Sequence, residues 1–150
     1  IEMAISETCH CGDVEFTLQN DPMMHFVCHC NDCQKIWNNS FFCFAFSLDD
    51  IEINGTMSKY AFCGGSGNNL NIHFCPKCAT KLYVQPELIE GMIYIPCGLL
   101  KKYFEFSPKV EIFSHNKPKF MSDVLASTES FEHNGTIERI GELLENLEQR

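Results

Sequence analysis

Four of the ten cysteines in this chain form two close pairs that lie far apart in the sequence. Cys9 and Cys11 stand in ETCHCGD, and Cys75 and Cys78 stand in HFCPKCA. Four thiolates complete the tetrahedral shell of a zinc ion and leave no open position, which is typical of a structural site. The two pairs therefore predict a structural zinc that ties an early strand to the middle of the chain across a long loop.

The spacing of Cys9 and Cys11 also predicts a local backbone shape. Residues i and i+2 of a flat strand lie ~6.5 Å apart, whereas neighbouring sulfurs around one zinc lie only ~3.8 Å apart. The C-x-C segment therefore needs a tight bend. Gly12 follows Cys11 directly and permits one, because glycine tolerates backbone conformations closed to other residues.

A second cluster stands in CHCNDC, where Cys28, Cys30 and Cys33 occupy three of six positions. Three protein thiolates on one ion are typical of a site that keeps one position for water or substrate. Residues that could close the site instead are His25, Asp32, Cys43, Cys63 and Cys97. We expect the last three cysteines to be small buried hydrophobic residues, so we expect an exogenous fourth ligand.

An open position on this second zinc predicts a reaction. A thiol that binds a zinc ion loses its proton, which makes it a nucleophile at neutral pH. Such a thiolate could attack the carbon of an aldehyde held beside it and give a hemithioacetal. An acid or water would supply the proton for the oxygen. This chemistry requires no nucleophilic side chain from the protein.

Composition excludes several other classes of function. The net charge is -9, with only 11 scattered basic residues, which argues against a nucleic-acid partner. The longest apolar run, Phe41 to Phe46, is far shorter than a membrane span. The first residues show no secretory signal. Because C-x-C and C-x-x-C spacings favour metal over disulfides, we expect a reducing cytoplasm.

Hydrophobic alternation with period two predicts a mainly β domain. We expect one domain over residues 1–150, with a core at about 5–122. The predicted strands cover residues 14–18, 24–28, 41–48, 51–53, 70–74, 81–84, 92–95 and 110–113. Apolar residues recur at helical spacing from Ile137 to Leu147, which predicts an amphipathic C-terminal helix at about 135–149.

Several motifs together resemble the glutathione-dependent formaldehyde-activating enzyme family, which also includes centromere protein V. The motifs are CHCG followed by V-x-F (Cys9 to Phe16), CHCxxC (Cys28 to Cys33), FCPxC (Phe74 to Cys78), CG-L (Cys97 to Leu99) and P-x-V-x-I-F (Pro108 to Phe113). They occur in the family's order, and the resemblance extends from Cys9 to about Phe120. Seven cysteines stand at the family's spacing.

The resemblance implies a fold, a cofactor and a reaction. The fold is a β-tent of two packed antiparallel sheets, as in methionine sulfoxide reductase B. The cofactors are a structural zinc on Cys9, Cys11, Cys75 and Cys78, and a catalytic zinc on Cys28, Cys30 and Cys33. The catalytic zinc takes the sulfur of glutathione as its fourth ligand. The reaction is the reversible addition of glutathione to formaldehyde, a carbon–sulfur lyase activity that gives S-hydroxymethylglutathione.

The chain departs from the family's pattern beside the second cluster. A basic pair usually follows the third cysteine, whereas this chain has Gln34 and Lys35. Lys35 could pair with a carboxylate of the ligand. Trp37 could line a pocket, although a core or lid position suits a large aromatic residue better. His29, between two ligand cysteines, is expected to point away from the metal, and His73 is expected to support the structural knuckle.

Three hypotheses about function follow from these residues. The first is a zinc-dependent lyase acting on a small thiol and a small aldehyde, without a nucleic-acid or membrane partner and with oligomerisation left open. The second is a non-catalytic, zinc-stapled interaction module with an idle second metal site. The third, a methionine sulfoxide reductase, would need a nucleophilic cysteine outside the metal sites, and Cys97 is the candidate.

Overall fold

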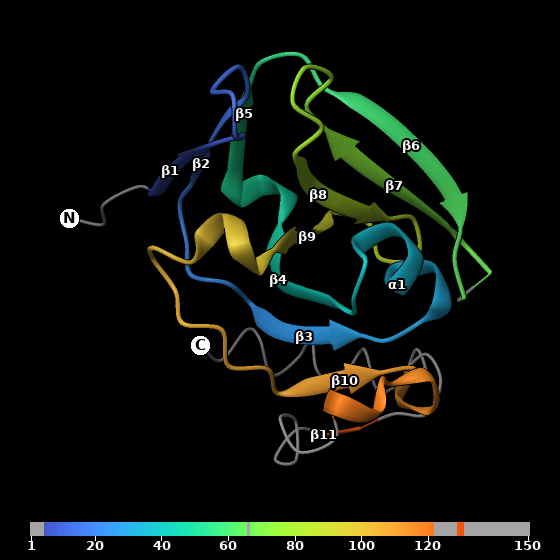
Figure 1. Cartoon of the computed structure of the whole chain (residues 1–150). Helices are drawn as coiled ribbons and strands as arrows, with labels where there is room; N and C mark the ends of the chain where they lie inside the picture. The colour runs from blue at the N-terminus through green and yellow to red at the C-terminus, as the bar shows by residue number, and fades with distance from the viewer. Residues whose placement is uncertain (1–4, 66, 122–128, 131–150) are drawn as a thin grey trace. The chain divides into compact units, whose positions relative to one another are not determined.

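A computed structural model describes residues 5–65, 67–121 and 129–130 of the chain (Figure 1). The backbone groups into two compact units, which we describe separately. The first unit contains Ile1–Pro22 and Phe44–Phe106, and the second contains Met23–Cys43 and Ser107–Arg150. The expectation of a single domain stays a prediction. The expected C-terminal helix at about 135–149 lies outside the described residues.

The first unit holds two sheets. The smaller sheet has the order β1-β2-β5 and is antiparallel, with Leu18 opposite both Ile5 and Ile51. In the larger one the order is β4-β9-β8-β7-β6, and Figure 1 shows β6, β7 and β8 side by side. The strands are β1 (Ile5–Thr8), β2 (Glu15–Leu18), β4 (Phe41–Ser47), β5 (Ile51–Asn54), β6 (Ser58–Cys63), β7 (Asn69–Phe74), β8 (Lys81–Pro86) and β9 (Met92–Pro96). The first three residues of β4 belong to the second unit.

Alternating side chains from both sheets form one hydrophobic core in the first unit. Phe16 and Leu18 come from the small sheet, and Phe44, Phe46 and Ile93 come from the large one. All five are nearly or fully buried. Because the period of a strand is two, alternate residues such as Phe44 and Phe46 point to the same face of the sheet. The prediction of a mainly β fold with two packed sheets is confirmed.

Two short 3-10 helices, η1 (Leu48–Asp50) and η2 (Cys97–Leu100), also belong to the first unit. Leu100 at the end of η2 is fully buried in the core. The ring of Phe44 meets the rings of Phe104 and Phe106 edge-on, at centroid distances of 5.8 and 5.6 Å. These contacts extend the core beyond the strands.

The second unit is built around two short parallel pairings. β10 (Val110–Ile112) pairs in parallel with β3 (Met24–Cys28) and with β11 (Glu129–Ser130). This differs from the expectation of purely antiparallel sheets. Parallel strands need a long connection, and the whole of residues 29–109 separates β3 from β10. The unit also contains α1 (Asn31–Trp37) and the 3-10 helices η3 (Ser114–Asn116) and η4 (Lys119–Met121).

The helix α1 begins within the second cysteine cluster. Cys30 is its N-cap, and the Sγ of Cys30 accepts a hydrogen bond from the backbone N–H of Cys33. Asn38 ends the helix with φ of 62°. Asparagine tolerates this left-handed conformation better than most residues, which suits it to a helix end. Among the described residues, no helix is long and apolar enough to cross a membrane.

Candidate metal centres

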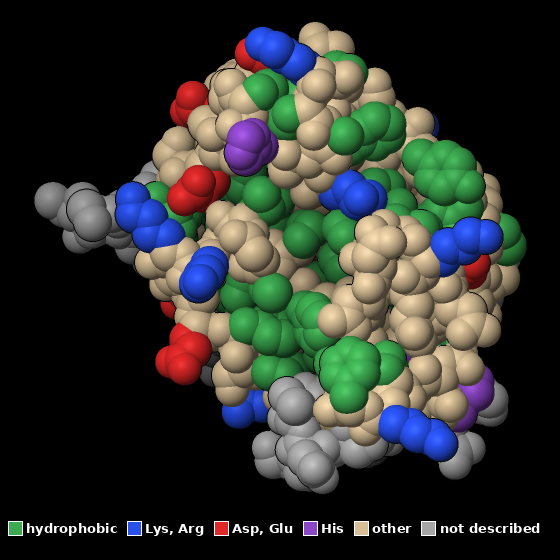
Figure 2. All heavy atoms as spheres, in the orientation of Figure 1, with side chains coloured by type: hydrophobic (Ala, Val, Ile, Leu, Met, Phe, Trp, Pro, Cys, Tyr) green, Lys and Arg blue, Asp and Glu red, His purple; other side chains and the backbone are tan. Residues whose placement is uncertain are grey.

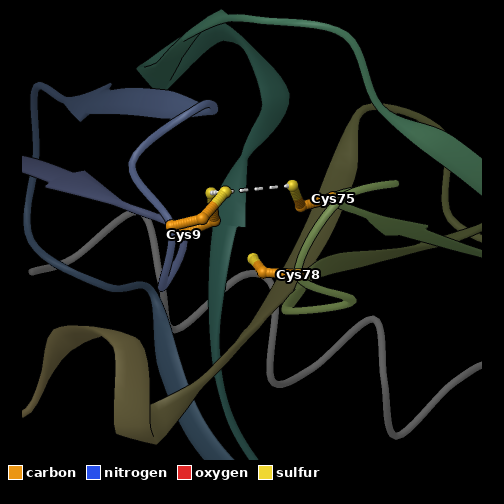
Figure 3. Close-up of side chains that lie close together, drawn as sticks. Cys9, Cys75 and Cys78 are labelled. Carbon is orange, nitrogen blue, oxygen red and sulfur yellow. Dashed lines mark hydrogen bonds between the residues drawn. The ribbon is translucent and has the colours of Figure 1, made fainter.

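The first unit brings Cys9, Cys11, Cys75 and Cys78 together. Their four sulfur atoms all lie within 4.8 Å of one another. The Sγ of Cys11 is 3.6 Å from that of Cys9 and 3.7 Å from that of Cys75. Figure 3 shows the sulfurs of Cys9, Cys75 and Cys78 facing a common space. These separations match the ~3.8 Å expected around one tetrahedral zinc ion.

Two tight turns shape this four-cysteine cluster. Gly12 has φ of +88°, and its N–H donates to the carbonyl of Cys9 at 3.1 Å. The predicted bend after the C-x-C pair is therefore present. At the Cys75 knuckle, the N–H of Ala79 donates to the carbonyl of Cys75 at 2.8 Å. Ala79 has φ of 62°, a conformation that favours glycine.

Hydrogen bonds favour the thiolate form of two residues in the four-cysteine cluster, Cys9 and Cys78. The backbone N–H of Val14 donates to the Sγ of Cys9 at 3.3 Å. The hydroxyl of Thr80 lies 3.1 Å from the Sγ of Cys78, and this contact lowers the pKa of Cys78 to about 5. Ligand cysteines must lose their protons to bind metal, so these donors suit a metal site.

The second unit brings Cys28, Cys30 and Cys33 together. Their three sulfurs also lie within 4.8 Å of one another, and the side chains are only 6–9% exposed. Cys28 ends β3, Cys30 caps α1, and Cys33 lies in the first turn of α1. The sequence thus positions the cluster at a strand-to-helix junction. Soft thiolate ligands of this kind suit zinc.

The three thiols of this cluster differ in acidity. Hydrogen bonds from Cys28 and Cys33 lower the pKa of Cys30 to about 3. The thiolate of Cys30 in turn raises the pKa of Cys28 to about 12. The pKa of Cys33 is also raised, first by its hydrogen bond with Cys28 and then by its hydrogen bond with Cys30. Of the three sulfurs, that of Cys30 therefore has the surroundings that most favour a thiolate. A cation bound by the three sulfurs would release their remaining protons.

No further His, Cys, Asp or Glu from the described part of the chain belongs to this three-cysteine cluster. Of the candidate fourth ligands, Asp32 is exposed, and His25 accepts a hydrogen bond at Nδ1 from the N–H of Ser107 at 2.9 Å. Cys43 is fully buried, as expected, and its Sγ lies 3.7 Å from the carbonyl of Phe26. Cys63, in contrast, is exposed, so its expected burial is wrong.

The ring of His29 points into a buried polar network. Its Nδ1 lies 2.6 Å from the Oγ of Ser40, and its Nε2 lies 2.8 Å from the Oε2 of Glu111. The other carboxylate oxygen of Glu111 accepts from the Nζ of Lys117 at 2.8 Å. Both ring nitrogens of His29 are thus engaged, in line with the expectation that His29 does not bind the metal. Burial lowers the pKa of His29, which favours the neutral imidazole.

Sequence reasoning missed Ser40, Glu111 and Lys117. Glu111 is the one charged residue of the strand VEI, and it is fully buried. A carboxylate in a buried strand must find a partner, so its place in that strand was the available signal. Its partner could not be read from the sequence, because 82 positions separate Glu111 from His29.

The other residues that the sequence singled out do not belong to either cysteine cluster. Lys35 is exposed in the last turn of α1, and Gln34 is half-buried beside it. The ring of Trp37 stacks on that of Phe41, with centroids 4.3 Å apart. In the first unit, His73 stacks on Tyr83 at 4.4 Å, and burial lowers its pKa. On the described part of the face drawn in Figure 2, the basic side chains are lysines, scattered among hydrophobic and other residues.

Comparisons with known proteins add a family and a fold. A family model described as glutathione-dependent formaldehyde-activating enzyme matches residues 4–116. A crystal structure of a Rhodobacter sphaeroides protein is similar in fold, with a TM-score of 0.52 and 21% sequence identity. The similarity covers 67% of this chain and 91% of that one. No curated protein sequence matches this chain.

Proposed function

The chain belongs to the glutathione-dependent formaldehyde-activating enzyme family, and we propose that it is a zinc-dependent carbon–sulfur lyase. In this proposal the chain catalyses the reversible addition of a small thiol to a small aldehyde, with glutathione and formaldehyde as the first pair to test. The observation that carries the proposal is the three-cysteine cluster. It offers three buried sulfurs, and no fourth protein ligand comes from the described residues.

The reaction is balanced by the thiol and aldehyde alone. In the forward direction the thiol loses its proton, its sulfur forms a bond to the aldehyde carbon, and the carbonyl oxygen takes up a proton. The product is a hemithioacetal. In the reverse direction the carbon–sulfur bond breaks and the same proton leaves the hydroxyl. Neither direction consumes an oxidant or a reductant.

The chain's own residues have separate tasks in this proposal. Cys28, Cys30 and Cys33 would hold the zinc ion. When bound, the zinc would supply Lewis acidity that lowers the pKa of a fourth, exogenous sulfur. Burial of the three cysteines would limit the contact of bulk water with their sulfurs. Lys35, exposed on α1, would pair with a carboxylate of the thiol substrate.

The four-cysteine cluster has a different task in the proposal. Cys9, Cys11, Cys75 and Cys78 would hold a structural zinc, because four thiolates leave no position for a substrate. That zinc would join the turn after β1 to the turn after β7. We also propose that the chain works in a reducing cytoplasm, since thiolate ligands must stay reduced to bind zinc.

An NMR exchange experiment with carbon-labelled formaldehyde and glutathione tests the proposal. It measures how fast the labelled carbon exchanges between free formaldehyde and the glutathione adduct. We expect the purified zinc-loaded chain to accelerate the exchange in proportion to its concentration. Cys30→Ser should lose the acceleration, and Cys63→Ser is the matched control because Cys63 is exposed and outside both clusters. Wild-type exchange at the uncatalysed rate, with several thiols and aldehydes, would contradict the proposal and favour the interaction module.

A further inference from the structure

His29, which lies between two of the candidate ligand cysteines, forms hydrogen bonds through four of its atoms. The backbone N–H of His29 donates to the carbonyl of Ile112 at 3.1 Å. The carbonyl of His29 accepts from the Nε2 of Gln34 at 2.8 Å. Its ring nitrogens meet Ser40 and Glu111. A residue held at its N–H, its carbonyl and both ends of its ring has little remaining freedom.

The pairing of β3 with β10 explains why the ring turns away from the sulfurs. Glu111 lies directly opposite Val27 in the parallel register. Opposed residues point to the same face, and successive residues alternate between faces. Val27 and Glu111 therefore share one face, and Cys28 lies on the other. The contact of His29 with Glu111 places its ring on the face of Glu111. The network holds the C-x-C segment from the side opposite its sulfurs.

The charges of this network are matched. The carboxylate of Glu111 is fully buried, and a buried charge needs paired donors for both oxygens. Lys117 donates to Oε1 and His29 faces Oε2, at 2.8 Å each. Because Lys117 is only 18% exposed, this ion pair is poorly screened by solvent. Glu111 is thus a fixed acceptor against which the ring of His29 is oriented.

Gln34 connects the same segment to η3. Its Nε2 donates to the carbonyl of His29 and to the carbonyl of Asn116, both at 2.8 Å. Gln34 lies one residue after Cys33 on α1. One amide group therefore joins the helix that carries Cys33 to the backbone between Cys28 and Cys30. The hydrogen bond to His29 therefore links the segments that carry the three ligands, and the hydrogen bond to Asn116 connects them to η3.

We propose that His29, held by Glu111 and assisted by Gln34, is a positioning residue that presets the sulfurs of Cys28, Cys30 and Cys33 for a metal ion. The inference rests on the proposed function for the metal, and it adds which residues set the affinity. A C-x-C segment free to extend would have to lose backbone entropy on binding. Here that entropy is lost on folding, so the cluster meets the ion in its binding geometry.

Glu111→Gln tests this inference sharply. A carboxylate accepts from both His29 and Lys117, whereas an amide has one oxygen and one NH2 group. One orientation of Gln sets its NH2 group against the ammonium of Lys117, and the other forces the ring of His29 into the tautomer in which Nδ1 donates to Ser40. The matched control is Asp13→Asn, which makes the same change of charge two residues from Cys11. The carboxylate of Asp13 forms only an exposed pair with Lys77, at 3.7 Å.

The readout is cobalt(II) affinity, followed by sulfur-to-metal charge-transfer absorption in competition with a chelator. Cys30→Ser serves as the reference variant: the cobalt-binding step that is present in the wild type and missing in Cys30→Ser is assigned to the three-cysteine cluster. We expect Glu111→Gln to weaken that step by about 10- to 100-fold, as loss of groups that support metal ligands commonly does. The other step should not change, and Asp13→Asn should leave both steps as in the wild type.

Unchanged cobalt affinity in Glu111→Gln, with or without a lower urea midpoint, would overturn the inference, because a merely structural role moves only the midpoint. If Glu111→Gln does not fold, Ser40→Ala takes its place, since it removes a neutral partner of His29 and leaves the charged pair of Glu111 and Lys117 intact. Weaker cobalt binding by folded Ser40→Ala supports the inference, and wild-type binding overturns it.

Failure of the proposed function would look different from failure of this inference. A wild-type chain that binds a second cobalt but does not accelerate adduct exchange contradicts the lyase and leaves the positioning role standing. A wild-type chain with only one cobalt step contradicts both.

Discussion

The Nε2 of His29 lies 2.8 Å from the Oε2 of Glu111, and both side chains are fully buried. This contact joins His29, which lies between two candidate ligand cysteines, to β10, the strand that pairs with β3 although 82 positions separate Glu111 from His29. The geometry of the three-cysteine cluster is therefore coupled to the stability of the second unit.

Replacing His29 should destabilise the protein as well as the metal site. His29→Ala removes one partner of a buried carboxylate, and hydrogen bonds to charged groups contribute about 1.5–3 kcal/mol. We expect the free energy of unfolding, measured with urea on metal-free reduced protein, to fall by roughly this amount. His10→Ala, at an exposed position between the other C-x-C pair, should change it little. Equal losses in the two variants would contradict the role of the buried network.

Loss of the four-cysteine cluster should unfold the first unit. Cys75 is fully buried in the core, next to the sulfur of Cys11. Structural zinc contributes on the order of 10 kcal/mol to the folding of small zinc domains. Cys75→Ser should therefore lose one zinc per chain and the near-ultraviolet circular dichroism of the folded state. The account of this cluster would be wrong if Cys75→Ser kept both its fold and its full zinc content.

A glycine at the knuckle should stabilise the chain. Ala79 has φ of 62°, and the left-handed conformation costs a residue with a Cβ about 1–2 kcal/mol. The greater freedom of glycine in the unfolded state offsets about 0.4–1 kcal/mol of that gain. We expect Ala79→Gly to raise the free energy of unfolding by up to about 1 kcal/mol. The control Ala61→Gly, on the exposed side of β6, should lower it, because glycine weakens a strand.

Acid should destabilise the second unit through His25. Burial, followed by the charge of Lys109, lowers the pKa of His25 below its usual value. The unfolded chain therefore binds the proton more readily, so stability present above about pH 6.5 is lost as the pH falls toward the folded pKa. Protonation at Nδ1 would also break the hydrogen bond from the N–H of Ser107.

Urea midpoints of the wild type and of His25→Gln, compared between about pH 7.5 and pH 5.5, measure this effect. The midpoint of the wild type should fall more steeply than that of His25→Gln, which cannot titrate at this position. Acid release of metal would affect both proteins alike. Parallel pH profiles would show that His25 makes no contribution.

Features with a local cause could be predicted from the sequence. The cysteine pairs meet because C-x-C and C-P-x-C spacings allow few other arrangements, and the bend at Gly12 follows from the distance between sulfurs. Alternating residues such as those of β4 and β9 predicted strands to within a residue or two. Strand periodicity expresses the two faces of a sheet, so it can be read in a few residues.

Features that depend on tertiary structure could not be predicted. The helix α1 has seven residues, and its cap is a cysteine, so no periodic signal or common capping residue marks it. The edge strand β6 buries little and lacks strong alternation. The parallel pairing of β10 with β3 depends on register between distant segments. The partner of Glu111 depends on that same register.

The central claim is that the three-cysteine cluster binds a metal that accepts an external thiol. Cobalt-loaded protein, titrated with glutathione while its visible absorption is recorded, tests this claim most directly. In Cys30→Ser the serine oxygen can still cap α1, while the cluster loses a thiolate. We predict that glutathione alters the spectrum of the wild type and leaves that of Cys30→Ser unchanged. A wild-type spectrum that stays constant with saturating glutathione and with other small thiols would contradict the claim.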